Sequence, residues 1–423
     1  MTLRSVSAAQ ALMLASLVFQ TTVLPDTLDI HSISRVANLV IMVVFFALSL
    51  RVFLRGRMRK LPLFYFAPIA LILVAYSINI LRSLSVETIG YVAGLLPWLA
   101  GLSVPFLKSY SLDDSWKLFF RFMVFFSVIA LIEFAALFAG QLAPSLIVTD
   151  RGEFVKGYMT LFHGLEDGTV YYKMYGVFPE PGTFAMLLLP AFAYALVYWK
   201  PWAMALFGVC LYFTNSLGGE FSLVILLALY AYRKARGGIA GPLILSALGT
   251  AAVYFLFPLF AATYAMKGDS AAVREANVSM FKQGFLTVLQ QHPFGFPLSG
   301  SSFSALQDVS TGYLGSNFEP YTVFVTGGVL AFLMYCIYFI WVSSRSIRYL
   351  LGPDRDQLYT CAFLSLPPLL IFVWQRNTLL TSTLFAFLFA MPVVTMRRRS
   401  VKSLHPPVAP DAPLLRSGAR LAT

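Results

Sequence analysis

Long apolar stretches alternate with short polar segments from one end of this chain to the other. Crossing about 30 Å of hydrocarbon takes about 20 apolar residues in a helix, because no water is present there to pair the backbone groups. The pattern therefore predicts about twelve spanning helices and an all-α polytopic membrane protein, with residues 1–396 as one transmembrane domain. The predicted spans are 8–24, 36–54, 63–81, 88–107, 117–140, 181–199, 202–215, 220–232, 242–264, 321–343, 357–374 and 377–396.

Two neighbouring spans, 202–215 and 220–232, are short, and the connector between them is polar. Residues 214–220 read TNSLGGE, which is too polar to face lipid. We expect this connector to face protein or water.

Composition agrees with a membrane protein, since 58% of the residues are hydrophobic and only 12% are charged. The three cysteines, Cys210, Cys336 and Cys361, lie inside apolar runs, so their placement supports neither a disulfide framework nor a zinc site. The four histidines form no helix-spaced pair. We expect neither a metal nor a cofactor.

The net charge of +12 could suggest a nucleic-acid partner, but the positions of the basic residues relative to the spans instead predict how the protein is oriented in the membrane. Lys and Arg are retained on the cytoplasmic side of a membrane, and most of the basic residues fall inside when both termini are cytoplasmic. Examples are the clusters at 51–60, 233–236 and 397–399. This predicts a multi-pass protein of a bacterial inner membrane, with residues 397–423 as a disordered cytoplasmic tail.

The same topology predicts two long periplasmic loops, at residues 141–180 and 265–320, whereas the cytoplasmic connections are short. Most of the acidic residues also fall outside. Chemistry is therefore expected at the outer face.

Glu180 is the most suggestive acidic residue, because it stands at the mouth of a helix in Phe178-Pro179-Glu180-Pro181. It suits an N-terminal cap before a proline, where the helix dipole favours an anion. It equally suits a base that accepts a proton from a sugar hydroxyl. Glu133 lies inside the fifth span, where a carboxylate is costly unless it is paired or hydrated, and is a second candidate.

Cations on the outer side form the other candidate group. Residues 270–291 read as an amphipathic helix that carries Arg274 and Lys282 and stops at His292. A guanidinium can grip a diphosphate with two hydrogen bonds, which favours Arg274, whereas Lys282 also fits a solvated helix face. Arg376 sits in a short turn between two spans. The remaining outer cations, which include Arg151 and Lys173, also suit contact with lipid headgroups.

Three passages resemble the superfamily of Wzy-type polysaccharide polymerases and O-antigen ligases. They are GVFPEPGTFA at residues 176–185, then Arg274 followed by a helix and HPFG at 292–295, then Ser316-Asn317 leading to Gly327-Gly328. Each motif is loose, and their order is the stronger signal. Ligases typically carry a histidine where this chain has Ser316, which favours a polymerase, and the chain looks most like xanthan-type exopolysaccharide polymerases.

The resemblance implies a GT-C glycosyltransferase whose donor and acceptor are undecaprenyl-diphosphate-linked oligosaccharides. Such a reaction needs cations for the departing diphosphate and a base near the attacking hydroxyl, so we expect Glu180, Arg274 and Arg376 as catalytic residues. The expected substrate-binding residues are Lys173, Lys282, Arg151, Asn317 and Glu319. Further expected partners are membrane lipids and a chain-length regulator and flippase of the same pathway. Two alternatives stay open: a ligase, and a flippase or other transporter. Transporters usually build their sites at the bilayer midplane, where this sequence has little charge.

Overall fold

The computed structural model describes somewhat less than half of the chain, and most of this part is helical. The described residues are 63–82, 111–141, 145–149, 152–156, 159–163, 173–178, 180–234, 289–295, 319–352 and 356–373, with a few single positions elsewhere. Seven of the predicted spans correspond to helices within these ranges. They are α4 (Leu63–Arg82), α6 (Leu112–Phe138), α7 (Pro181–Val197), α8 (Pro201–Phe213), α9 (Leu217–Lys234), α14 (Glu319–Leu351) and α15 (Gln357–Val373). The other five spans, and the tail at 397–423, lie largely or wholly outside the described residues.

The helices begin where the sequence supplies caps and prolines. Ser111 caps α6, its hydroxyl accepting from the Asp114 N–H at 3.3 Å, and Asp113 and Asp114 occupy the first turn, where acidic residues favour the helix dipole. Pro181 and Pro201 open α7 and α8, where a missing N–H costs nothing.

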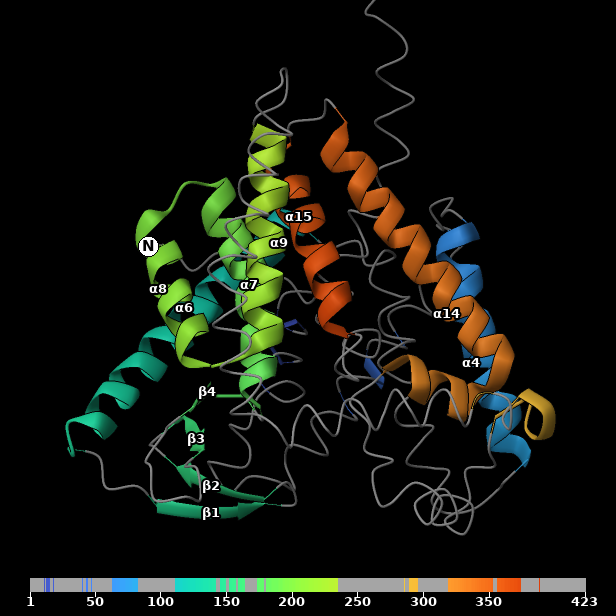
Figure 1. The fold of residues 1–423 in the computed structure, drawn as a ribbon, viewed down its shortest axis with the longest axis horizontal. Coiled ribbons are helices and arrows are strands. Elements are labelled where there is room, and N and C mark those ends of the chain that lie inside the picture. The colour runs from blue at the N-terminus through green and yellow to red at the C-terminus, as the bar shows by residue number, and fades with distance from the viewer. Residues whose placement is uncertain are drawn as a thin grey trace, which may run out of the picture.

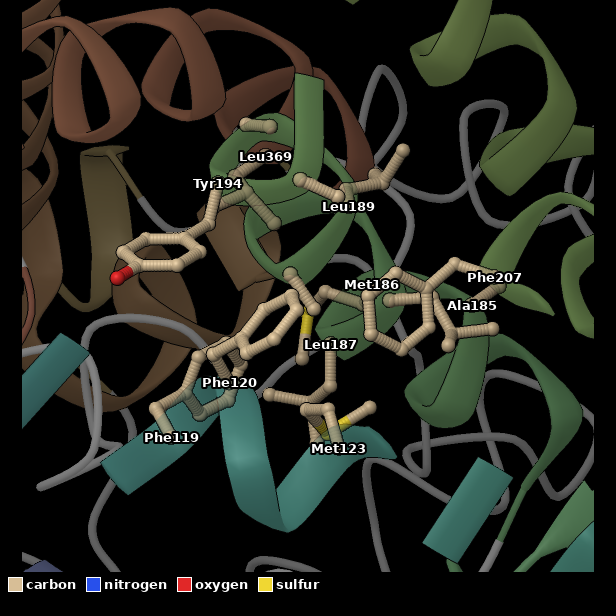
Figure 2. Close-up of a cluster of buried hydrophobic side chains, with 14 of the residues drawn as sticks. Phe119, Phe120, Met123, Ala185, Met186, Leu187, Leu189, Tyr194, Phe207 and Leu369 are labelled. Carbon is tan, nitrogen blue, oxygen red and sulfur yellow. The ribbon is translucent and has the colours of Figure 1, made fainter. Parts of the chain in front are cut away.

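Helix α7 is the centre of the packing and is buried on nearly every side. It contacts α6, α8, α9 and α15. Figure 2 shows the largest core, in which Phe120 and Met123 of α6 and Phe207 of α8 surround the middle of α7. Helices α4 and α14 pack along each other with a smaller core of their own, and α15 joins the two groups.

Two helical segments, Leu112–Phe138 and Gly327–Leu351, are long and apolar enough to cross a membrane. Each leaves a stripe of large apolar side chains exposed at spacings of three and four residues, which places them on one face of a helix. The stripes are Phe125, Val128 and Ile132 on α6, and Leu330, Leu333, Ile337 and Ile340 on α14. Such a contiguous exposed face is unfavourable in water and favourable in lipid.

The expectation of an all-α fold needs a correction, because residues 145–176 contain a four-stranded antiparallel sheet. Its strands run in sequence order: β1 (Ser145–Thr149), β2 (Gly152–Lys156), β3 (Leu161–His163) and β4 (Lys173–Gly176). The described part of the chain is therefore mostly helical, with a small sheet in the segment expected to be the first long outer loop. Figure 1 shows the sheet beneath the lower ends of α6 to α9.

The helices have two chemically different ends (Figure 1). We call the lower one the sheet end, because it carries β1–β4 and also the segment 292–295. We call the upper one the basic end, because it holds the C-termini of α9 and α14 with Arg233, Lys234 and Arg348. At the basic end, Arg233 donates to the carbonyl oxygens of Tyr349 and Leu350, both at 3.3 Å, and so satisfies the last turn of α14.

Candidate active site

The first of the three resembling passages, 176–185, forms a tight corner between the sheet and α7. Gly176 ends β4 with a φ of +59°, and a Cβ there would stand 3.1 Å from the Phe184 ring. The rings of Phe178 and Phe184 stack at 5.2 Å, and both are fully buried. The chain therefore passes directly from the last strand into α7 and carries Glu180 on a rigid support.

Glu180 is the N-cap residue of α7, with extended backbone angles (φ −152°, ψ 146°), and its carbonyl accepts from the Phe184 N–H at 3.2 Å. Its half-buried side chain makes no capping hydrogen bond to the first turn. The cap interpretation of this residue thus rests on the helix dipole alone.

The polar connector between α8 and α9 packs against the same part of α7. Thr214, Gly218 and Gly219 are buried, which confirms that the connector faces protein. A Cβ at Gly219 would stand 2.7 Å from the Cβ of Ala185. The first turn of α9, which contains Glu220, therefore lies against the first two turns of α7, close to the corner that carries Glu180.

Lys173 is the first residue of β4 and is half-buried, opposite His163 in the sheet register. Burial lowers the pKa of its ammonium group below 10.5, because desolvation disfavours the charged form. It stands seven residues before Glu180 on the strand that leads into the corner, which suits a cation that meets an anionic substrate.

The second and third passages are in direct contact. Residue Gly328 interrupts α14 with φ 69° and ψ −165°, and a Cβ there would lie 2.2 Å from the carbonyl oxygen of Pro293. Next to the break, the Val329 N–H donates to that carbonyl oxygen at 2.9 Å. The predicted helix before this segment ends at Gln291, as expected.

Arg82, at the end of α4, completes this contact by donating to the carbonyl oxygen of Gly295 at 3.4 Å. Arg82 is one of the outer cations that the sequence did not single out. One sequence signal could have indicated this contact: Gly327-Gly328 interrupts an apolar span, and a glycine there leaves room for another segment, here HPFG at 292–295. We call this group, made of Arg82, residues 292–295 and Gly328, the α14 break.

Glu133 is nearly completely buried and lies on α6, close to the sheet. Its carboxylate accepts three hydrogen bonds from Met159 and Thr160. The sequence had suggested this residue as a candidate for chemistry inside the membrane. Its hydrogen-bond partners connect α6 to the segment directly before β3.

The remaining predicted site residues lie at the start of α14 or outside the described residues. Glu319 is the first residue of α14. Arg151, Arg274, Lys282, Asn317 and Arg376 lie outside the described residues. Within the part of the chain that the structure describes, no three His, Cys, Asp or Glu side chains come together as metal ligands would.

Comparison with known proteins adds nothing to this picture. No family model, no curated protein and no solved structure matches the chain.

Proposed function

We propose that this chain is a glycosyltransferase of a bacterial inner membrane that polymerises undecaprenyl-diphosphate-linked oligosaccharides at the periplasmic face. The observation that carries the proposal is the contact at the α14 break. Two of the passages that carry the resemblance, HPFG at 292–295 and the one that leads to Gly327-Gly328, are separate in the sequence and meet through the Val329 to Pro293 hydrogen bond. The first passage, at the Glu180 corner, lies at the same end of the helices.

The membrane part of the proposal is supported by the exposed apolar stripes on α6 and α14, which hydrocarbon would cover. The orientation is supported by the two chemically different ends. Arg233, Lys234 and Arg348 lie at the basic end, which suits the cytoplasm. The sheet end then meets the periplasm, where the lipid-linked substrates would lie.

The proposed reaction transfers a glycan from a lipid diphosphate to a sugar hydroxyl. The hydroxyl oxygen of the acceptor attacks the anomeric carbon of the donor, and the bond from that carbon to the diphosphate oxygen breaks. The electron pair leaves with the diphosphate, and the hydroxyl proton passes to the Glu180 carboxylate as general base. Arg274 and Arg376 are proposed to bind the departing diphosphate, since guanidinium groups match its geometry and charge. Lys173, on the strand that leads to Glu180, suits the same anion.

Deletion of the gene in the source bacterium tests this function against the two alternatives. Loss of a polymerase leaves single repeat units on the lipid carrier at the outer face. Loss of a ligase leaves long polymer on the carrier, and loss of a flippase leaves single units at the inner face. The proposal expects the first pattern, and either of the others would replace it.

Reconstitution supplies the direct test. Purified protein in liposomes, given the lipid-linked units extracted from the deletion strain, should yield a ladder of longer lipid-linked glycans. Units that stay single under these conditions, with folded protein present, would contradict the proposal.

A further inference from the structure

The buried carboxylate of Glu133 is used by none of the steps above, yet it is fully engaged. It accepts from the Met159 N–H at 2.9 Å, from the Thr160 N–H at 3.2 Å and from the Thr160 hydroxyl at 2.7 Å. Glu133 is 6% exposed and Thr160 is fully buried. A buried carboxylate is costly unless it is hydrogen-bonded, and three donors offset that cost.

The donors belong to the short segment directly before β3, so the contact joins α6 to the sheet. Leu161, the residue after Thr160, pairs with Gly176, and Phe162 pairs with Met174. Strand β4 in turn packs against both α6 and α7. Gly176 stands four residues before Glu180. One continuous set of hydrogen bonds and packed residues therefore links Glu133 to the corner that carries the proposed base.

The chemistry of the contact explains why a carboxylate is present on an otherwise apolar face. Its neighbours on α6, Ala130, Phe134 and Leu137, are buried apolar residues. All three partners of Glu133 are donors, and a carboxylate offers acceptors only. A glutamine at this position would turn its NH₂ group toward at least one of the donors. The three donors therefore favour glutamate over glutamine at this position.

We propose that Glu133 is a positioning residue, which holds the sheet on α6 and thereby fixes the corner that presents Glu180 to the substrate. This inference rests on the proposed function. The chain then uses two carboxylates near the same end of the helices in different roles: Glu180 accepts the proton, and Glu133 sets where that proton acceptor stands.

Hydrogen exchange tests the contact without any assay of activity. In Glu133→Ala, the amides of Met159 and Thr160 should exchange about tenfold faster or more, since each loses a hydrogen bond to a charged group. The amides of α7 should keep their protection, which shows that the helices remain folded. Unchanged exchange at 159–160 would overturn the contact itself.

Turnover tests the positioning role. Small displacements of a reacting group lower the rate, so Glu133→Ala should lower kcat per folded molecule by about 10- to 100-fold and change KM little. Glu133→Gln should fall between the alanine variant and the native protein. Thr160→Ser keeps the hydroxyl and should behave as the native protein, whereas Thr160→Val loses one bond and should slow turnover partly.

Asp113→Ala is the matched control. Asp113 is also a carboxylate of α6, but it lies at the opposite end of that helix from Glu133, is exposed and pairs with Lys117. The substitution should leave turnover unchanged. If Glu133→Ala does not fold, Thr160→Val carries the same test. Normal turnover in a variant whose 159–160 amides have lost protection would overturn the positioning role. If the native protein makes no polymer, the proposed function fails together with that role, while exchange still decides the contact.

Discussion

Three carboxylates of this chain show how surroundings decide what the same group does. Asp113 is exposed and pairs with Lys117 one helical turn away, an arrangement that contributes little to stability. Glu133 is buried and bound by three donors. Glu180 stands on an extended backbone between a buried aromatic corner and a helix start, and its side chain does not cap that helix. Of the three, Glu180 combines a rigid support with a side chain that the fold does not use as a cap.

We expect Glu180→Gln to abolish most of the activity while leaving the protein folded. The amide keeps the shape of the side chain but accepts no proton, so kcat should fall about 100-fold or more. Because the side chain makes no capping hydrogen bond, the loss of stability that comes from its place at the helix start should be only the helix-dipole part, about 0.3 to 1 kcal/mol. Turnover per molecule and thermal unfolding, measured on one preparation, separate the two effects.

Asp113→Asn is the control for this change, since it also removes a carboxylate from the N-terminal end of a helix. It should show the small loss of stability without the loss of rate. Normal turnover in Glu180→Gln would remove Glu180 from the reaction and make Glu319, in the other Glu-Pro pair at a helix start, the next residue to test.

The half-buried Lys173 should titrate at lower pH than a free lysine. Its folded-state pKa lies below 10.5, so the folded protein releases the proton more readily than the unfolded chain does. The stability cost of burying this charge is therefore fully present below the lowered pKa and is relieved as pH rises toward 10.5. Amine labelling followed by mass spectrometry should show the midpoint for Lys173 at lower pH in the folded protein than in the unfolded protein. A midpoint at or above 10.5 would contradict the desolvation that burial implies.

The sequence predicts where Glu133 and Glu180 lie along their helices, but only for Glu180 does it indicate the local geometry. Proline at the first position of α7 and Gly176 before it are local signals, readable without any partner. The donors to Glu133 are two backbone N–H groups and one hydroxyl, 26 and 27 residues further along the chain. Backbone donors leave no mark in a sequence, so this contact could only be found in three dimensions.

Helix α14 is interrupted within its length, at Gly328. Its apolar pattern predicts a continuous helix, and Gly328 interrupts it with backbone angles that essentially only glycine adopts. The break lets the segment 293–295 approach the helix backbone more closely than any side chain would permit. Broken helices at membrane depth are tolerated where protein satisfies the freed backbone, as Pro293 does for Val329.

Gly328→Ala should therefore destabilise the protein strongly. The new Cβ would lie 2.2 Å from the backbone oxygen of Pro293, and the backbone angles at this position would strain any L side chain. Together these effects should cost about 2 to 5 kcal/mol, measured as a lower unfolding temperature in detergent. Gly208→Ala in α8 is the control, because nothing lies within 4 Å of its Cβ position, and it should be neutral or slightly stabilising. Equal stability of the two variants would show that the α14 break does not exist.

The sheet is the element that hydrophobic periodicity missed. Its strands are only three to five residues long. A search for apolar stretches of about 20 residues passes over such strands. A local signal is nevertheless present, since the β-branched Ile147, Val148 and Thr149 are separated from Gly152 by only two residues, as in a hairpin. The seven described helices, by contrast, were predicted to within several residues, because each depends on its own composition.

The described helices run in two opposite directions between the sheet end and the basic end. Helices α4, α6, α8 and α15 run toward the sheet end, while α7, α9 and α14 run away from it. From α6 to α9, and again from α14 to α15, the direction alternates, as successive crossings of one membrane require. The basic residues of α9 and the last turn of α14 then gather at one end, joined by the hydrogen bonds of Arg233 to α14. The sheet, Glu180 and the α14 break gather at the other.

Because carrying Lys or Arg across the hydrocarbon costs about 2.5 to 3.5 kcal/mol per residue at the helix centre, the basic end should stay in the cytoplasm and the sheet end should face out. Single cysteines test this in a chain whose Cys210, Cys336 and Cys361 are replaced by alanine. With the outer membrane made permeable, Lys156→Cys in β2 should react with an impermeant maleimide in intact cells. Lys234→Cys at the end of α9 should react only after lysis of the inner membrane. The reverse pattern would put the Glu180 corner in the cytoplasm, away from the proposed periplasmic substrates. Reaction of both cysteines in intact cells would mean that the basic end and the sheet end do not lie on opposite sides of the inner membrane. Each outcome therefore bears directly on where the chemistry can take place.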